Sequence, residues 1–93
     1  MAVRLFSNVT SNTDSNSIQV TGFVGSVYAF GTFNGATVAV QCSADNLNWL
    51  EDANVAFTQN TVRNLDVTGF IRGNCRSVIG SQTNVNLIMI DKR

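Results

Sequence analysis

The sequence predicts an all-β protein, a single-domain antiparallel β-sandwich or jelly roll of about eight short strands. Two observations lead to this fold class. The polar part of the chain is mostly uncharged, since 33 of the 93 residues are Asn, Thr, Ser or Gln and only 13% are charged. Short alternating runs rich in Val, Phe and Thr are separated by clusters of Asn, Asp, Gly and Ser, and no helical period persists.

Residues 1–93 are expected to form one domain, because the length suits one domain and no linker stands out. In the last predicted strand, residues 84–91, the C-terminal end is apolar on both faces, which predicts a central or covered position. The expected strands cover residues 3–9, 17–23, 27–33, 36–42, 53–58, 62–67, 74–79 and 84–91.

Residues 1–16 form a possible N-terminal arm followed by a polar connector. Such an arm could reach across a seam between neighbouring proteins through backbone and apolar contacts. Arg4, Leu5 and Phe6 would then be the anchors on the partner. The alternative, which we prefer, is that residues 3–9 are an edge strand of the domain's own sheet.

Asn34-Gly35 is the clearest local signal, because both residues tolerate the positive φ angles of a two-residue turn. It predicts a hairpin between residues 27–33 and 36–42, in a register that the turn fixes. One face of that hairpin would contain no polar side chain. Its members would be Val27, Ala29, Gly31, Phe33, Ala36, Val38, Val40 and Cys42.

The opposite face of this hairpin would combine two aromatic side chains, Tyr28 and Phe30, with polar neighbours. It is too polar for an interior and rather aromatic for open water, and aromatic residues are enriched in subunit interfaces. Tyr28 and Phe30 are therefore candidate partner-interface residues. The alternative, which we prefer, is that a second sheet or a loop of the same chain covers both rings.

The stretch after the hairpin predicts a second turn, in which Asp45 and Asn46 bond to the backbone through their side chains. Trp49 is expected to pack over the hairpin and to be largely buried, with ligand stacking as the alternative. Glu51 and Asp52 are expected in a solvated turn. On a strand they would point to opposite faces, so they do not make a catalytic carboxylate pair.

The missing residue types exclude several kinds of chemistry. There is no histidine, which removes Ser-His-Asp and Cys-His catalysis and most zinc chemistry. Cys42 and Cys75 are too far apart in sequence for a C-x-x-C pair, and they are expected to be small, half-buried apolar residues rather than a disulfide. We assign no catalytic, cofactor-binding or metal-binding residue, and we expect no enzyme.

The charge balance bears on partners. Six basic residues are matched by six acidic ones, and no basic run is longer than Lys92-Arg93. Direct binding to nucleic acid is therefore not expected. No stretch approaches the roughly 20 apolar residues of a membrane span, and residues 1–10 do not have the pattern of a secretory signal.

Residues 30–49 read F-G-T-F-N-G-A-T-V-A-V-Q-C-S-A-D-N-L-N-W. This stretch resembles a pattern in small structural proteins of tailed bacteriophages: Gly-Thr-Phe, a Gly-Ala-Thr-Val strand, Gln-x-Ser-x-Asp and then Trp. Residues 69–79 and 85–90 are similar to strands that follow in those proteins. Such proteins include capsid cement or decoration proteins and parts of tails or fibres.

The resemblance implies a virion component on the capsid surface, made in the host cytoplasm and needing no cofactor. Its partner would be the major capsid protein, whose neighbouring subunits it would clamp together, commonly as a homotrimer. The alternative is a tail or head-fibre module that binds host-surface glycans through Trp49 or Tyr28.

Overall fold

The computed structural model describes residues 2–79 and 82–92, which are all-β and contain no helix. The ends Met1 and Arg93 of the predicted domain, and residues 80–81, lie outside the described residues. All strand pairs are antiparallel, so the predicted fold class is confirmed. The strands are β1 (Ala2–Val9), β2 (Thr13–Asp14), β3 (Ile18–Thr32), β4 (Thr37–Ser43), β5 (Leu50–Phe57), β6 (Thr61–Arg76) and β7 (Asn84–Asp91).

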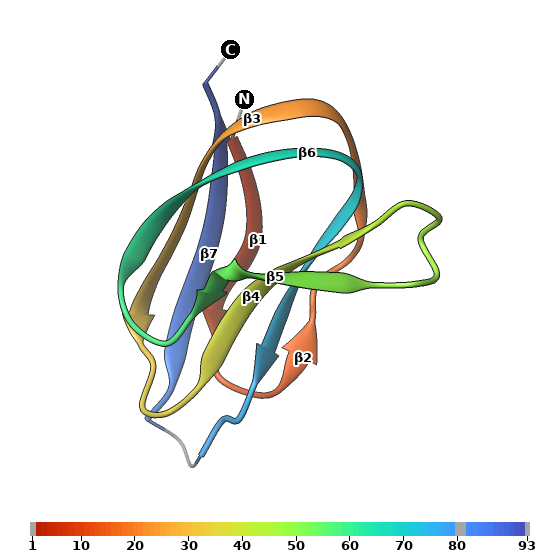
Figure 1. Ribbon diagram of the computed structural model, residues 1–93. Helices are drawn as coiled ribbons and strands as arrows, with labels where there is room; N and C mark the ends of the chain where they lie inside the picture. The colour runs from red at the N-terminus through yellow and green to blue at the C-terminus, as the bar shows by residue number, and fades with distance from the viewer. Residues whose placement is uncertain (1, 80–81, 93) are drawn as a thin grey trace.

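These strands belong to one sheet with the order β1-β7-β3-β6-β4-β5, and β2 also pairs with β6. The sheet folds over itself: β3 and β6 arch across the top of Figure 1 and connect a layer containing β1 and β7 with a layer containing β4 and β5. The first part of β6 pairs with β3, and its last part pairs with β4. Strand β7 lies between β1 and β3, which confirms its predicted central position.

Both long strands change layer at the same place. The β3–β6 ladder is interrupted by a register shift between Val20 and Phe23. Gly22 (φ 61°) and Gly69 (φ 131°) lie there in conformations that favour glycine, and the Gly22 N–H donates to Thr68 Oγ1 over 2.8 Å. A bulge of this kind increases the local bend and twist of a sheet, which allows both strands to turn together.

The prediction of eight short strands is wrong where glycines interrupt the pattern. All but the end residues 17 and 33 of the predicted strands 17–23 and 27–33 belong to the single strand β3, and residues 62–67 belong with 74–76 to β6. Glycine bends these strands without ending them. At Gly25 it also permits a close approach, because an added Cβ would overlap the carbonyl oxygen of Ile90 on β7.

The turn at Asn34-Gly35 forms, whereas the predicted hairpin does not. Both residues have positive φ (47° and 88°), and the Ala36 N–H donates to the Phe33 carbonyl over 2.9 Å. However, β3 pairs with β6 and β7, and β4 pairs with β5 and β6. The turn therefore joins strands of different layers, and the apolar residues on its two sides face the shared core instead of lying side by side.

The core lies between the two layers, and β1 contributes to it. Leu5 and Phe6 are only 8% and 4% exposed. The Phe6 ring packs against Gly73 of β6, where an added Cβ would lie 2.9 Å from Phe6 Cε2. Strand β1 is an edge strand paired with β7, which agrees with the preferred expectation. The alternative of a free arm is wrong for Leu5 and Phe6, because their apolar side chains fill the space between the layers. The largest fully buried side chains are Phe23, Val27, Val38, Val40, Val55, Ile71, Cys75, Thr83, Val85, Leu87 and Met89.

Replacing Phe6 with Ala is expected to lower the free energy of unfolding by about 3–5 kcal/mol, because a cavity would open between β1 and β6. Arg4→Ala, an exposed position on the same strand, is the control and should change stability by roughly 0.5 kcal/mol or less. Urea denaturation followed by circular dichroism measures both. Equal, small losses for the two variants would contradict the placement of β1 in the core, whereas failure of Phe6→Ala to fold would support it.

Candidate protein-interaction surface

The candidate site is the solvent-facing side of the layer formed by β1, β7, β3 and the first part of β6, which we call the outer face. Arg4 pairs with Ile88, Ile88 with Tyr28, and Tyr28 with Val62. Directly opposed residues of antiparallel strands project from the same face. These four side chains therefore form one row across four strands.

The outer face exposes large apolar side chains. Tyr28 and Phe30 are 42% and 40% exposed. Val62 and Ile90 are exposed to a similar extent. Ile88, which lies beside Tyr28 in the row, is half-buried. No described segment of the chain covers the two aromatic rings, so the preferred expectation that they are covered is wrong. A contiguous apolar surface of this kind commonly marks an interaction site.

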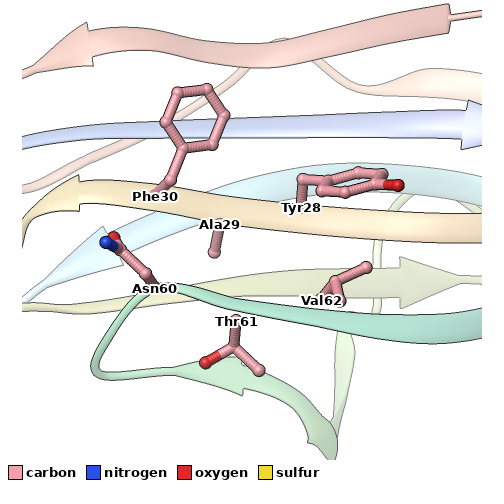
Figure 2. A pocket seen from close by; sticks show the side chains of 6 residues that line it. All are labelled: Tyr28, Ala29, Phe30, Asn60, Thr61 and Val62. Atoms are coloured by element: carbon pink, nitrogen blue, oxygen red, sulfur yellow. The ribbon is translucent and has the colours of Figure 1, made fainter.

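A shallow hollow of about 360 Å³ lies beside the two rings. Figure 2 shows Tyr28 and Phe30 projecting on one side of β3 while Ala29 between them points the other way. Asn60 fixes one end of the hollow, because its Oδ1 accepts a 2.8 Å hydrogen bond from the Gly31 N–H. The lining residues are Tyr28, Ala29, Phe30, Asn60, Thr61 and Val62.

Three of the five predicted interface residues come together on the outer face, namely Arg4, Tyr28 and Phe30. A hydrogen-bond relay connects two of them: Arg4 Nη1 donates to Asn86 Oδ1 over 3.3 Å, and Asn86 Nδ2 donates to the Phe30 carbonyl over 3.4 Å. Leu5 and Phe6 lie in the core, so they have little surface to offer a partner.

Sequence analysis missed Val62, Ile88 and Ile90 as members of this surface. They reach it through the pairing of β3 with β6 and with β7, which joins segments far apart in the chain. The end of residues 84–91 is apolar on both faces. This pattern could have pointed to Ile88 and Ile90, which lie on the face opposite the core.

A second exposed feature is the loop between β4 and β5, which projects from the body of the molecule in Figure 1. Asp45 holds its shape as predicted: Oδ1 accepts the backbone N–H groups of Leu47 (2.9 Å) and Asn48 (2.8 Å) and the Ser43 hydroxyl (3.0 Å). These bonds, and another from the Asn48 side chain, hold the pKa of the Asp45 carboxyl well below its usual range. The loop is therefore ordered by its own hydrogen bonds.

This ordered loop presents apolar side chains to solvent. Leu47 in the loop and Leu50, the first residue of β5, are 81% and 76% exposed. Trp49 is half-buried, so the expectation that it is largely buried is wrong. The Arg72 guanidinium carbon lies 4.4 Å from the centroid of the Trp49 ring, in the geometry of a cation–π contact. One face of the indole is thereby occupied.

Glu51 and Asp52 lie at the start of β5 and not in a turn, so that prediction is wrong. Glu51 accepts two 2.7 Å hydrogen bonds from the Arg76 guanidinium, and this contact lowers the pKa of its carboxyl. Asp52 Oδ1 accepts the Asn54 N–H over 2.9 Å where β5 bulges away from β4. A strand forms here and not a turn, because Arg76 of β6 pairs with the Glu51 carboxylate.

Cys42 and Cys75 are free thiols. Cys42 is half-buried, as predicted, whereas Cys75 is buried. Burial raises the pKa of both thiols. Within residues 2–79 and 82–92 no cluster of three or more His, Cys, Asp or Glu could hold a metal ion. In the same ranges no helix is long and apolar enough to cross a membrane.

Comparison with protein-family models, curated proteins and solved structures gives no match to this chain. Two features stand out: an exposed apolar sheet face with a hollow, and an ordered loop carrying exposed leucines.

Acid is expected to destabilise the β4–β5 loop. The pKa values of Asp45 and Glu51 are lower in the folded chain than their ordinary values near 4. The unfolded chain therefore binds more protons as the pH falls below about 4, and the free energy of unfolding decreases there. Thermal unfolding at pH 6 and pH 3 should show a smaller pH-dependent loss for Asp45→Asn than for the wild type. An unchanged loss would contradict the role of Asp45.

Proposed function

We propose that this chain is a non-enzymatic structural protein of a virion, a capsid cement or decoration protein that clamps neighbouring major capsid subunits. The outer face is the observation that supports the proposal. Exposed side chains such as Tyr28, Phe30 and Ile90 lie on a continuous four-strand layer, beside Arg4. Aromatic and arginine side chains on such a surface are typical of protein interfaces. The resemblance of residues 30–49 to phage structural proteins is the reason for proposing a virion as the location.

The two outermost strands of the sheet order, β1 and β5, favour docking through a face and not by strand addition. Strand β1 has register shifts after Arg4 and after Phe6, and β5 has one opposite the stretch between Ala39 and Gln41. Bulged edges do not offer a regular ladder to another strand. A partner would therefore contact side chains, which the outer face provides.

Assembly on a capsid would also allow each single contact to be weak. A repeating capsid lattice offers many equivalent sites, and a homotrimer would engage several at once, so weak contacts multiply. The balance of six basic and six acidic residues fits a protein surface as partner and provides no basic stripe for nucleic acid.

Wild-type protein added to undecorated capsids should bind in stoichiometric amounts and raise the temperature of capsid disruption. Ile90→Asp puts a charge into the outer face and should weaken binding at least tenfold, which corresponds to about 1.4 kcal/mol. Ile79→Asp is the matched control, because Ile79 is an exposed isoleucine outside this face. Sedimentation of capsids with bound protein measures both. Absence of wild-type binding at micromolar concentration would overturn the proposal.

Glycan binding by a tail or head-fibre module is the second candidate. The hollow beside Tyr28 and Phe30, with the amide of Asn60 at its end, has the aromatic and polar groups that a sugar ring could contact. Trp49 is the weaker platform, since Arg72 occupies one face of its ring. A glycan array should then give signals that Tyr28→Ala removes and Trp49→Ala does not, and a silent array would count against this function.

A further inference from the structure

The chain carries two exposed apolar features that have complementary shapes. One projects: the β4–β5 loop, with Leu47 and Leu50 exposed. The other is concave: the hollow beside Tyr28 and Phe30. The loop precedes β5 and the hollow begins with Asn60 just after it, so the length of this strand separates them. A loop cannot reach the hollow of its own chain.

We propose that the β4–β5 loop of one copy inserts into the hollow of a second copy, in a head-to-tail contact. The leucine side chains would pack against the rings of Tyr28 and Phe30 and against Val62. The contact is heterologous, since different surfaces of the two copies meet, and it generates a closed ring when the rotation between copies closes. The partner for this part of the outer face is thus the chain itself, which leaves Ile88 and Ile90 for other contacts.

The sizes of the two features fit. A volume of 360 Å³ corresponds to about a dozen water-sized groups at roughly 30 Å³ each. A leucine side chain has four carbon atoms, so the hollow has room for Leu47, and for Leu50 as well. Filling it removes apolar surface of both copies from water, which is the main favourable term in association.

Among the described residues, the charged side chains near the two features that have no ion-pair partner are opposite in sign. Arg4 lies near Phe30, beside the hollow. Arg63 follows the lining residue Val62 on β6, and its Nη1 donates to the Val62 carbonyl over 3.0 Å. Asp45 lies in the loop, and Asp52 lies just beyond it on β5. Within the described part of the chain none of these four takes part in an ion pair, since the two observed pairs are Arg72–Asp14 and Arg76–Glu51. Complementary charge would steer and orient the two copies.

The loop is prepared for insertion before any contact forms. Asp45 accepts the backbone N–H of Leu47 itself, and Asn46 next to it has a positive φ of 63°, which asparagine tolerates. An ordered loop loses less conformational entropy on binding than a flexible one. The hydrogen bonds of Asp45 thus hold the loop in the shape in which it would make the contact.

The chain alone, without capsids or glycans, tests this inference, so its outcome is independent of the proposed function. Size-exclusion chromatography with light scattering should show concentration-dependent association of the wild type. A loop variant, Leu47→Asn with Leu50→Asn, and a hollow variant, Tyr28→Ser with Phe30→Ser, should each remain monomeric. Ile79→Asn, which removes an exposed isoleucine elsewhere, should associate as the wild type does. Circular dichroism checks that each variant folds.

Mixing the two monomeric variants is the decisive measurement. The loop variant keeps an intact hollow and the hollow variant keeps an intact loop, so the mixture should contain one-to-one heterodimers and nothing larger. A face-to-face contact between two outer faces predicts no heterodimer and continued association of the loop variant. Either of those results, or a wild type that stays monomeric at about 0.5 mM, where a millimolar contact would be detected, overturns the inference. A monomeric chain that still binds capsids would overturn this inference alone.

Discussion

The bend shared by β3 and β6 is the constraint on which the rest of the structure depends. The sheet is continuous, so its apolar residues become a core only if one part of it folds onto the other. Gly22 and Gly69 supply the backbone conformations at the bend, and beyond it Phe6 of β1 meets Gly73 of β6 across the interior. The same fold leaves the opposite side of the β1-β7-β3-β6 layer in solvent.

Local sequence signals predicted local structure well and long-range pairing poorly. The turn at Asn34-Gly35 forms because positive φ is a property of those two residues. Whether the strands beside it pair is decided by β5, β6 and β7, which compete for the same edges and come later in the chain. The division of β3 and β6 failed for a related reason, since a glycine bends a strand or ends it according to what packs there.

The candidate surface was also predicted only in part, because local patterns were informative and long-range strand pairing was not. Alternation along a single strand was enough to separate Tyr28 and Phe30 from the core-facing Val27 and Ala29. Leu5 and Phe6 were left with two interpretations, because a short apolar run next to a polar connector is compatible with both an arm and an edge strand. Only the contact with β6 decides between them. Ile88 and Val62 could not be assigned, because their place beside Tyr28 follows from pairing across most of the chain.

The composition and the exposed surface together favour assembly. Equal numbers of acidic and basic residues leave no net charge, and a net charge near zero removes the long-range repulsion that keeps copies apart. Large apolar side chains are nevertheless exposed at the outer face and at the β4–β5 loop. Such a chain would aggregate without order if these side chains lay on flexible or flat edges. Instead, the bulges of β1 and β5 hinder strand addition at the two outermost strands, and the loop is held in one shape by Asp45. Any association through these surfaces would therefore use contacts of defined geometry, as the proposed role in a capsid requires.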